Sequence, residues 1–348
     1  MKQVTWVSVL LLFCVQGFLT AEAGEDWVSL IIGGLGGGIG NELITAESVC
    51  NGNEATPNIP PAEFGYIFGW SAALFSSNME KGEIMLCGGK DTIESKKCYN
   101  LPVGSSSWKR DVCELERERI NANMFSTSDG KIVISGGYSS KAGWLKDVQM
   151  LQSYDPDCTS NCCQWDNIGT IDGKGVYSHC ALQYDEDHFV FMGGNTWDSN
   201  GQYDIADVQI FNYKTGQWTK GKDIPIPRQG HGCIKTTHNG RDGIMIAGGF
   251  CNGNPNHPDC YQLRLDSTMF YDFESDEWTE LSPLNNARDG LVLNNVEGTI
   301  MAIGGQYRGA PVEIIEKWNG DSWEESISLK DKVSSFANVQ VKKTDYKC

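Results

Sequence analysis

Six runs of aliphatic residues in this chain each end in a pair of glycines. The first glycines stand at positions 33, 88, 136, 193, 248 and 304, so successive pairs are 55, 48, 57, 55 and 56 residues apart. A repeat of about fifty residues that carries strand-like runs is typical of propellers, in which each repeat forms one blade. We therefore predict a β-propeller with one blade for each pair. The pairs are Gly33-Gly34, Gly88-Gly89, Gly136-Gly137, Gly193-Gly194, Gly248-Gly249 and Gly304-Gly305.

Each repeat also carries a pattern of four strands. A first strand-like run precedes the second run, which ends in the glycine pair, and an alternating third run follows with aromatic residues. The fourth run contains a tryptophan in five of the repeats, where it supplies a large apolar body between neighbouring sheets. These tryptophans are Trp108, Trp165, Trp218, Trp278 and Trp323. The first repeat has no such tryptophan, so its outer strand stays undefined.

A glycine pair followed by a tyrosine and a tryptophan at these offsets resembles the repeat of the kelch family, and the resemblance covers residues 24–348. It implies an all-β fold, namely a six-bladed kelch-like β-propeller with four antiparallel strands in each blade. The resemblance also implies protein–protein interaction through the loop face of the ring.

The two ends of the propeller region predict how the ring closes. The region starts with a second strand, Trp27 to Ile32, and no first strand precedes it. An unpartnered strand, Ser335 to Val341, follows the last tryptophan. We expect this C-terminal strand to complete the first blade and close the ring, which removes open sheet edges that invite aggregation. Kelch propellers close in a similar way.

The N-terminus predicts export. Lys2 precedes an apolar stretch from Val4 to Leu19, and Ala21-Glu22-Ala23 forms a small-x-small cleavage site. Residues 1–23 are therefore expected to be a secretory signal peptide, and the protein to be secreted and extracellular. The stretch is short for a membrane span, so none is predicted, although an uncleaved signal anchor is the alternative.

Cysteine usage agrees with export. Of the thirteen cysteines, one lies in the predicted signal peptide, and an even number remains, which favours disulfides. Cys251 and Cys260 bracket one loop, and Cys87 and Cys98 fall on adjacent predicted strands. A third group, Cys158, Cys162 and Cys163, is close in sequence, and a zinc site is its alternative to structural bridges. The connectivity stays open.

Charge and motifs limit the function. The formal net charge of −17 disfavours nucleic acid and anionic membranes as partners. The glycine-rich segment 33–40 lacks the spacing and the following helix of a dinucleotide site, so no cofactor is predicted. His179 and His231 begin first strands near the predicted channel mouth, where a metal pair is the alternative to hydrogen bonds with neighbouring backbone.

The longest insertions indicate a binding face. In an antiparallel four-strand blade, the loop between strands two and three emerges on the same side as the connection to the next blade. That side receives the insertions 138–144, 195–203 and 250–264, which carry the residue types favoured at binding hot spots. The candidate binding residues are Tyr138, Trp144, Trp197, Tyr203, Tyr261, Arg264, Arg119, Arg228, His231 and Arg288. The recurring arginines, Arg119, Arg228 and Arg288, have a structural alternative, in which they bond backbone carbonyls between blades.

These observations predict a secreted, non-enzymatic module that binds an extracellular protein or matrix component through its loop face. A carbohydrate-binding propeller is one alternative, since Trp144 and Trp197 are suited to stacking on sugar rings. A secreted enzyme of unknown chemistry is the other, because propellers host many reactions on one fold.

Overall fold

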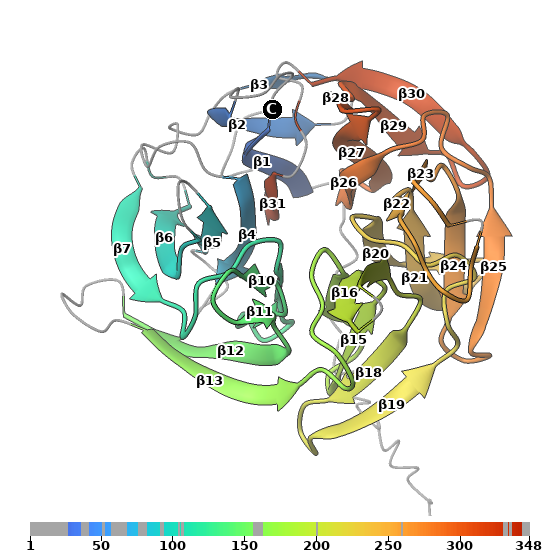
Figure 1. Ribbon diagram of the computed structural model, residues 1–348. Helices are drawn as coiled ribbons and strands as arrows, with labels where there is room; N and C mark the ends of the chain where they lie inside the picture. Colours follow the sequence, from blue (N-terminus) through green and yellow to red (C-terminus); the bar gives the residue numbers. More distant parts are fainter. Residues whose placement is uncertain are drawn as a thin grey trace, which may run out of the picture.

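The computed structural model describes residues 27–35, 42–50, 53–56, 68–75, 82–90, 94–103, 105, 108–155, 163–199, 201–258, 260–329, 333 and 336–342. Within these residues the regular elements are β-strands, arranged as a propeller of antiparallel sheets around a central axis (Figure 1). The predicted signal peptide, residues 1–23, lies outside the described residues, as do Cys158 and Cys162. Among the described residues no helix is long and apolar enough to cross a membrane.

Five blades of the described chain are each built from four strands of one continuous stretch, which follow one another from the axis outwards. The β4–β7 blade has β4 (Phe68–Phe75), β5 (Glu83–Lys90), β6 (Lys97–Pro102) and β7 (Lys109–Glu114). The β8–β13 blade has β8 (Asn123–Ser126), β9 (Ile132–Ser135), β12 (Asp147–Tyr154) and β13 (Cys163–Thr170). The β14–β19 blade has β14 (Cys180–Gln183), β15 (His188–Met192), β18 (Val208–Asn212) and β19 (Gln217–Gly221). The β20–β25 blade has β20 (Gly232–His238), β21 (Arg241–Ala247), β24 (Thr268–Asp272) and β25 (Glu277–Leu281). The β26–β30 blade has β26 (Asp289–Val296), β27 (Thr299–Tyr307), β29 (Ile314–Trp318) and β30 (Trp323–Ser328).

Another four-stranded sheet draws on both ends of the chain. It contains β1 (Trp27–Leu35), β2 (Glu42–Cys50), β3 (Asn53–Thr56) and β31 (Ala337–Lys342), in the order β3-β2-β1-β31. Where the sequence predicts six blades, the described residues therefore show five of the consecutive kind and this mixed sheet, which lies between the β26–β30 and β4–β7 blades in Figure 1. Strand β31 pairs with β1 over Trp27–Ile32, the segment expected to receive the C-terminal strand. Strand β3 lies at the edge of this sheet, next to β2.

In the five consecutive blades the glycine pairs lie at the end of the second strand, against the linker that leads to the next blade. Both Gly193 and Gly194 have positive φ angles, of 60° and 101°, which favour glycine. A Cβ atom on Gly193 would lie 2.6 Å from the carbonyl oxygen of Arg228, in the linker to the next blade. The amide of Gly194 donates a hydrogen bond of 2.8 Å to that same carbonyl. Glycine is thus required both by backbone conformation and by the close approach of the linker.

The core consists of apolar layers between neighbouring blades. Between the β8–β13 and β14–β19 blades, for example, buried Val133, Phe189 and Phe211 share one cluster. Trp218 stacks on Phe211 with ring centroids 4.5 Å apart, and so covers the outer side of this layer. The remaining tryptophans of the repeat occupy the corresponding strands, or in one case the residue before the strand: Trp108 before β7, Trp165 in β13, Trp278 in β25 and buried Trp323 in β30.

Four disulfides lie within the described residues, and two of them join neighbouring blades. Cys87–Cys98 links β5 to β6, and Cys251–Cys260 closes its loop, as the sequence predicts. Cys113–Cys163 joins the outer strands β7 and β13, and Cys180–Cys233 joins the innermost strands β14 and β20. Cys163, which is close in sequence to Cys158 and Cys162, thus has its partner in the preceding blade, and this pairing is one that the sequence left open.

Candidate binding face

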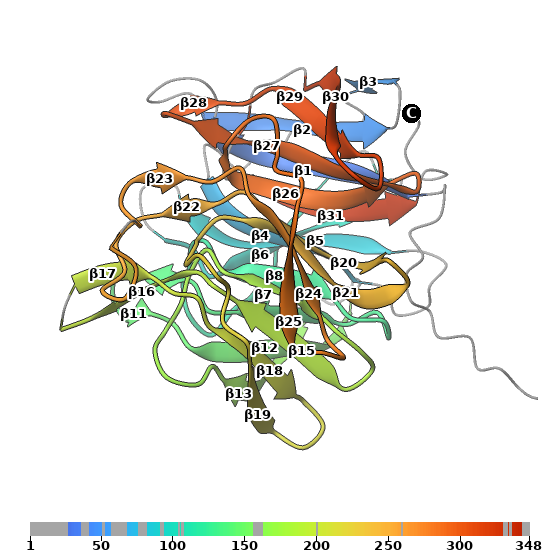
Figure 2. The same ribbon diagram turned by 90° about the vertical axis from the view of Figure 1, so that its right-hand side faces the viewer.

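Short hairpins stand on one side of the ring. They connect the second and third strands of their blades and form small antiparallel pairs separate from the main sheets, except at β28, which pairs with the end of β27. Figure 2 shows these hairpins along the left side of the molecule. They are β10 (Tyr138–Ser139) with β11 (Gly143–Trp144), β16 (Asn195–Asp198) with β17 (Gly201–Asp204), β22 (Phe250–Cys251) with β23 (Leu263–Arg264), and β28 (Ala310–Pro311). We call this side the hairpin face.

Exposed apolar side chains of the described residues concentrate on the hairpin face. The large hydrophobic side chains that are open to solvent there are Trp197 (56% exposed), Tyr261 (71%), Leu263 (44%) and Tyr307 (41%). All four belong to the hairpins or to the loops that they close. Soluble proteins rarely gather exposed apolar groups on one side, and such patches mark interaction sites.

An aromatic cluster joins two of the hairpins. It consists of Tyr138 and Trp144 from β10 and β11, Tyr177 from the linker between blades, and Trp197 from β16. The rings of Trp144 and Trp197 are stacked at 17° with centroids 6.1 Å apart. Tyr138 meets Trp144 edge to face at 5.1 Å, and Tyr177 lies 6.1 Å from Trp144. Two predicted binding residues, Trp144 and Trp197, are thus brought into contact from neighbouring blades.

Polar contacts hold the edge of this cluster in place. Gln202 donates a hydrogen bond of 2.8 Å to the hydroxyl of Tyr177, and burial raises the pKa of that hydroxyl. Lys174 bonds both Asp198 and the hydroxyl of Tyr203, and these partners raise the pKa of its ammonium group. The Tyr203 hydroxyl in turn donates to Asp198 over 3.0 Å. The predicted residue Tyr203 therefore lies at the border of the cluster, bonded rather than free.

Asp204 connects this region to the next hairpin. Its buried carboxylate accepts hydrogen bonds of 2.6 Å from the side chain of Asn195 and from the backbone amide of Asn252. Asn254 donates to the backbone carbonyl of Asp204 over 2.7 Å. Burial raises the pKa of Asp204 to about 7, against the lowering effect of the two donors. The 250–264 loop is thus anchored to β16 and β17, and the two hairpins form one continuous surface.

The 250–264 loop also contacts the following blade, β26–β30, so the hairpin surface continues onto that blade. Arg264 lies 5.1 Å over the ring of Phe250 and pairs with Asp289 at 2.6 Å. Asp289 also accepts a hydrogen bond of 3.0 Å from Gln306, at the end of β27. Tyr261 projects from the loop into solvent. Arg264 therefore braces the surface, whereas Tyr261 is open for contact.

The three recurring arginines do not belong to the exposed surface. Arg119, Arg228 and Arg288 are 1%, 0% and 0% exposed. Each donates to the carbonyl of the first glycine of the next blade: Arg119 to Gly136 at 2.9 Å, Arg228 to Gly248 at 3.0 Å and Arg288 to Gly304 at 3.3 Å. Their inclusion among the binding residues is wrong, and the structural alternative is correct.

The two histidines near the channel are buried as well. Burial lowers the pKa of His179 and of His231 to about 3, so both rings are neutral at physiological pH. His179 Nε2 lies 2.9 Å from the hydroxyl of Ser135, while neither ring nitrogen of His231 has a hydrogen-bond partner among the described residues. His231 is therefore not part of the exposed face. The described residues contain no group of three or more metal-ligating side chains.

Sequence reasoning missed Tyr177, Lys174, Asp198 and Asp204. Tyr177 and Lys174 lie on the linker before β14, and nothing in the sequence distinguishes them from other linker residues. Asp198 and Asp204 fall inside or beside a predicted insertion, but carboxylates are abundant in this chain. Only the packing of one hairpin against the next shows that Asp204 is buried.

A ring of repeated antiparallel blades, glycine pairs at the blade junctions and hairpins on one face define a kelch-type β-propeller. The family model of the KLHDC2/KLHL20/DRC7 Kelch-repeats domain matches residues 70–307. The chain therefore belongs to the kelch-repeat family.

Curated relatives agree with this assignment. Kelch-like protein 23 of Homo sapiens is 31% identical over 149 residues, which are 42% of this chain and 22% of that protein. Kelch-like protein 36 of Bos taurus is 28% identical over 215 residues, or 61% of this chain and 31% of the relative. Kelch-like protein terF of Aspergillus terreus is 25% identical over 235 residues, which cover 65% of this chain and 46% of the relative. The chain thus spans less than half the length of these relatives.

Proposed function

We propose that this chain is a non-enzymatic binding module that holds an extracellular protein on its hairpin face. The observation that carries this proposal is the concentration of exposed apolar side chains on the hairpins, beside the stacked pair Trp144 and Trp197. Rigid aromatic side chains bind with little loss of conformational entropy and are enriched at binding hot spots. Kelch-like relatives support a role in protein binding.

The test first isolates the partner protein and then removes the two tryptophans that are proposed to bind it. A pull-down from extracellular fluid with the chain from residue 24 identifies the partner, and calorimetry measures its affinity. Replacing both Trp144 and Trp197 by alanine should weaken binding by about 1–4 kcal/mol, the range for interface anchors, and leave the circular dichroism spectrum unchanged.

A matched change on the opposite side of the ring is the control. Asp185 lies in the turn before β15, away from the hairpins, and Asp185→Asn should alter little beyond the salt dependence of association. Loss of binding in this variant, with binding intact in the tryptophan variant, would place the functional face on the other side. Loss of binding after enzymatic removal of the partner's glycans would favour the carbohydrate-binding alternative.

We propose further that the protein is secreted after cleavage of residues 1–23. The basic Lys2, the apolar stretch and the Ala21-Glu22-Ala23 site support this, and disulfides within the propeller suit an oxidising compartment. Mass spectrometry of the protein from the culture medium should find Gly24 at the N-terminus. Retention in the cell with residues 1–23 intact would contradict secretion.

We also propose that the mixed sheet is the sixth blade and that the pairing of β1 with β31 closes the ring. The antiparallel register from Trp27–Lys342 to Ile32–Ala337 supports this proposal. Contacts of β31 with β4 and of β1 with β26 also support it, because they place the sheet against both neighbours. A closed ring has no open sheet edges at its seam.

A further inference from the structure

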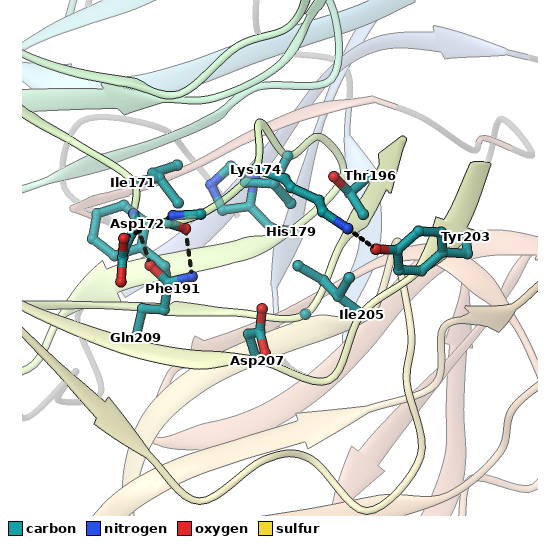
Figure 3. Close-up of a pocket in the computed structure, with 13 residues that line it drawn as sticks. Ile171, Asp172, Lys174, His179, Phe191, Thr196, Tyr203, Ile205, Asp207 and Gln209 are labelled. Carbon is teal, nitrogen blue, oxygen red and sulfur yellow. Dashed lines mark hydrogen bonds between the residues drawn. The ribbon is translucent and has the colours of Figure 1, made fainter. Parts of the chain in front are cut away.

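A cavity lies between the β8–β13 and β14–β19 blades, next to the aromatic cluster. Its volume is about 160 Å³. Figure 3 shows Lys174, Thr196 and Tyr203 at one end, Asp172 and Gln209 at the other, and Asp207 between the two ends. Sites that enclose a whole small-molecule ligand usually measure about 300–1,000 Å³. The cavity is therefore of a size to take one side chain rather than a metabolite.

The wall of the cavity is apolar. Ile171 and Val176 come from the end of the β8–β13 blade and the linker that follows it, and Phe191 and Ile205 come from the β14–β19 blade. These side chains belong to the layer between the two blades or pack against it. A long aliphatic stem gains by lying along such a wall while its polar end stays near the rim.

The charged groups of the cavity lining that remain available to a bound side chain are carboxylates, which accept hydrogen bonds. Lys174, the cation of the lining, already bonds Asp198 and Tyr203. Asp207 has an ion pair with Lys220 at 3.5 Å, but Lys220 lies closer to Asp223, at 3.0 Å. Asp172 accepts a hydrogen bond of 2.9 Å from the amide of Gly173 and has no cationic partner among the described residues.

His179 adds a buried imidazole ring to the cavity lining. Its Nδ1 atom has no hydrogen-bond partner in the described part of the chain. The ring is neutral, because burial lowers its pKa to about 3. Its Nε2 lies 2.9 Å from the hydroxyl of Ser135, so Nδ1 is the ring nitrogen left for a hydrogen bond with a bound side chain. The carboxylates of Asp207 and Asp172 favour a cation that donates several hydrogen bonds.

We propose that this cavity receives a single lysine or arginine side chain of the partner protein. The aliphatic stem would lie along the apolar wall, and the cation would bond Asp207 and Asp172. The net charge of −17 attracts a basic partner over a longer range. This inference rests on the proposed function for the identity of the guest, but its test needs no partner.

The first experiment titrates the chain from residue 24 with Nα-acetyl-arginine amide and Nα-acetyl-lysine amide. Methyl NMR signals of Ile171 and Ile205 report the cavity. Both probes should shift these signals saturably, while Nα-acetyl-norleucine amide, which has an aliphatic chain and no charge, should bind at least about tenfold more weakly. Equal binding of the neutral probe, or shifts confined to signals outside the cavity, would overturn the proposal.

The second experiment separates the cavity from general charge. Asp207→Asn and Asp172→Asn combined should weaken binding of the arginine probe at least about tenfold, since hydrogen bonds to charged groups are among the strong ones. Asp129→Asn and Asp185→Asn combined is the matched control, because it also removes two charges, from the turns before β9 and β15, and neither residue lines the cavity. A similar loss in both variants would show general charge attraction and refute the site.

The two proposals fail in different ways. If the tryptophan variant loses the protein partner but the arginine probe does not enter the cavity, only the cavity inference is wrong. If the probe binds as expected and the tryptophan variant keeps the partner, the hairpin-face proposal is wrong and the cavity remains a site for basic side chains.

Discussion

Each buried arginine ties two blades together. The carbonyl of Arg228 accepts the amide of Gly194 in one blade, and its guanidinium donates to the carbonyl of Gly248 in the next. Arg119 and Arg288 repeat this arrangement with their own glycine pairs. The guanidinium is planar and carries several donors in a fixed geometry. It therefore suits a junction where two segments of the backbone both present carbonyl oxygens. One residue per junction thus satisfies backbone groups that the sheets leave unpaired.

Arg228→Met should destabilise the fold by about 2–4 kcal/mol. The substitution keeps an apolar stem of similar length but leaves the carbonyls of Gly248 and Ile226 without the donors that they now have. Denaturant unfolding measures the loss. Arg117→Met, at an exposed position, is the control and should change stability by less than about 0.5 kcal/mol. Equal stabilities would mean that the buried arginine contributes no net bonding energy.

Asp204 should make stability depend on pH. Its pKa in the folded protein, about 7, is above the ordinary value of 3.8, so the folded state binds more protons between these values. The contribution of Asp204 to the free energy of unfolding is therefore highest near pH 3.8. It falls as pH rises towards 7, by up to about 1.4 kcal/mol for each pH unit. Asp204→Asn removes this contribution. The wild type should lose stability relative to the variant between pH 4 and pH 7, and parallel pH profiles would contradict the assignment.

At the scale of elements, the bridges between blades differ from those within them. Cys180–Cys233 joins β14 to β20 and closes a loop of 53 residues, whereas Cys251–Cys260 closes a loop of 9 residues. In the chain-entropy account, a bridge restricts the unfolded chain more when its loop is longer. The innermost strands of two blades are thereby held together even when the hydrogen bonds between blades open.

Removing Cys180–Cys233 should therefore cost more than removing Cys251–Cys260. Replacing both cysteines by alanine should lower the free energy of unfolding by about 4 kcal/mol for the first bridge and about 2.5 kcal/mol for the second. Each double variant loses two sulfur atoms, so the local packing changes are matched. Denaturant unfolding under oxidising conditions gives the two values. The reverse order would show that strain or local contacts outweigh the unfolded-chain effect.

For the whole molecule, the closing strand should decide whether the ring stays soluble. A chain ending at Lys330 loses β31 and leaves an edge of β1 unpaired. Unpaired edges associate with other chains, so we expect aggregation or failed secretion, measured by secreted yield and size-exclusion chromatography. Adding a synthetic peptide of residues 331–348 should restore soluble protein. A truncated chain that is soluble and unfolds cooperatively would refute closure by this strand.

The sequence predicts most of the fold because its main requirements are local. A glycine pair is needed where the backbone has positive φ angles and another segment of backbone passes close by. Both requirements belong to the position of the pair itself, so each pair marks the end of a second strand. Strand alternation likewise predicts which side receives Trp144, Trp197 and Tyr261. The pairing of Cys113 with Cys163 is different, because it depends on two outer strands from separate blades lying side by side.

The candidate site is less predictable than the fold for the same reason. Recurrence of Arg119, Arg228 and Arg288 fits either a surface or a structural role, and only their burial decides between the two. The stacking of Trp144 on Trp197 and the burial of Asp204 arise where one blade meets the next. The sequence contains no spacing that encodes these contacts.

The register of β1 with β31 has a mechanical consequence. Trp27 and Lys342 are paired partners at one end of the ladder. Tension applied at these two residues would therefore peel the ladder apart one pair at a time, instead of loading all of its hydrogen bonds together. Under the closure proposed above, a force between Trp27 and Lys342 would act on the seam of the ring. A load applied through the hairpins would instead be carried by blades that Cys113–Cys163 and Cys180–Cys233 hold covalently.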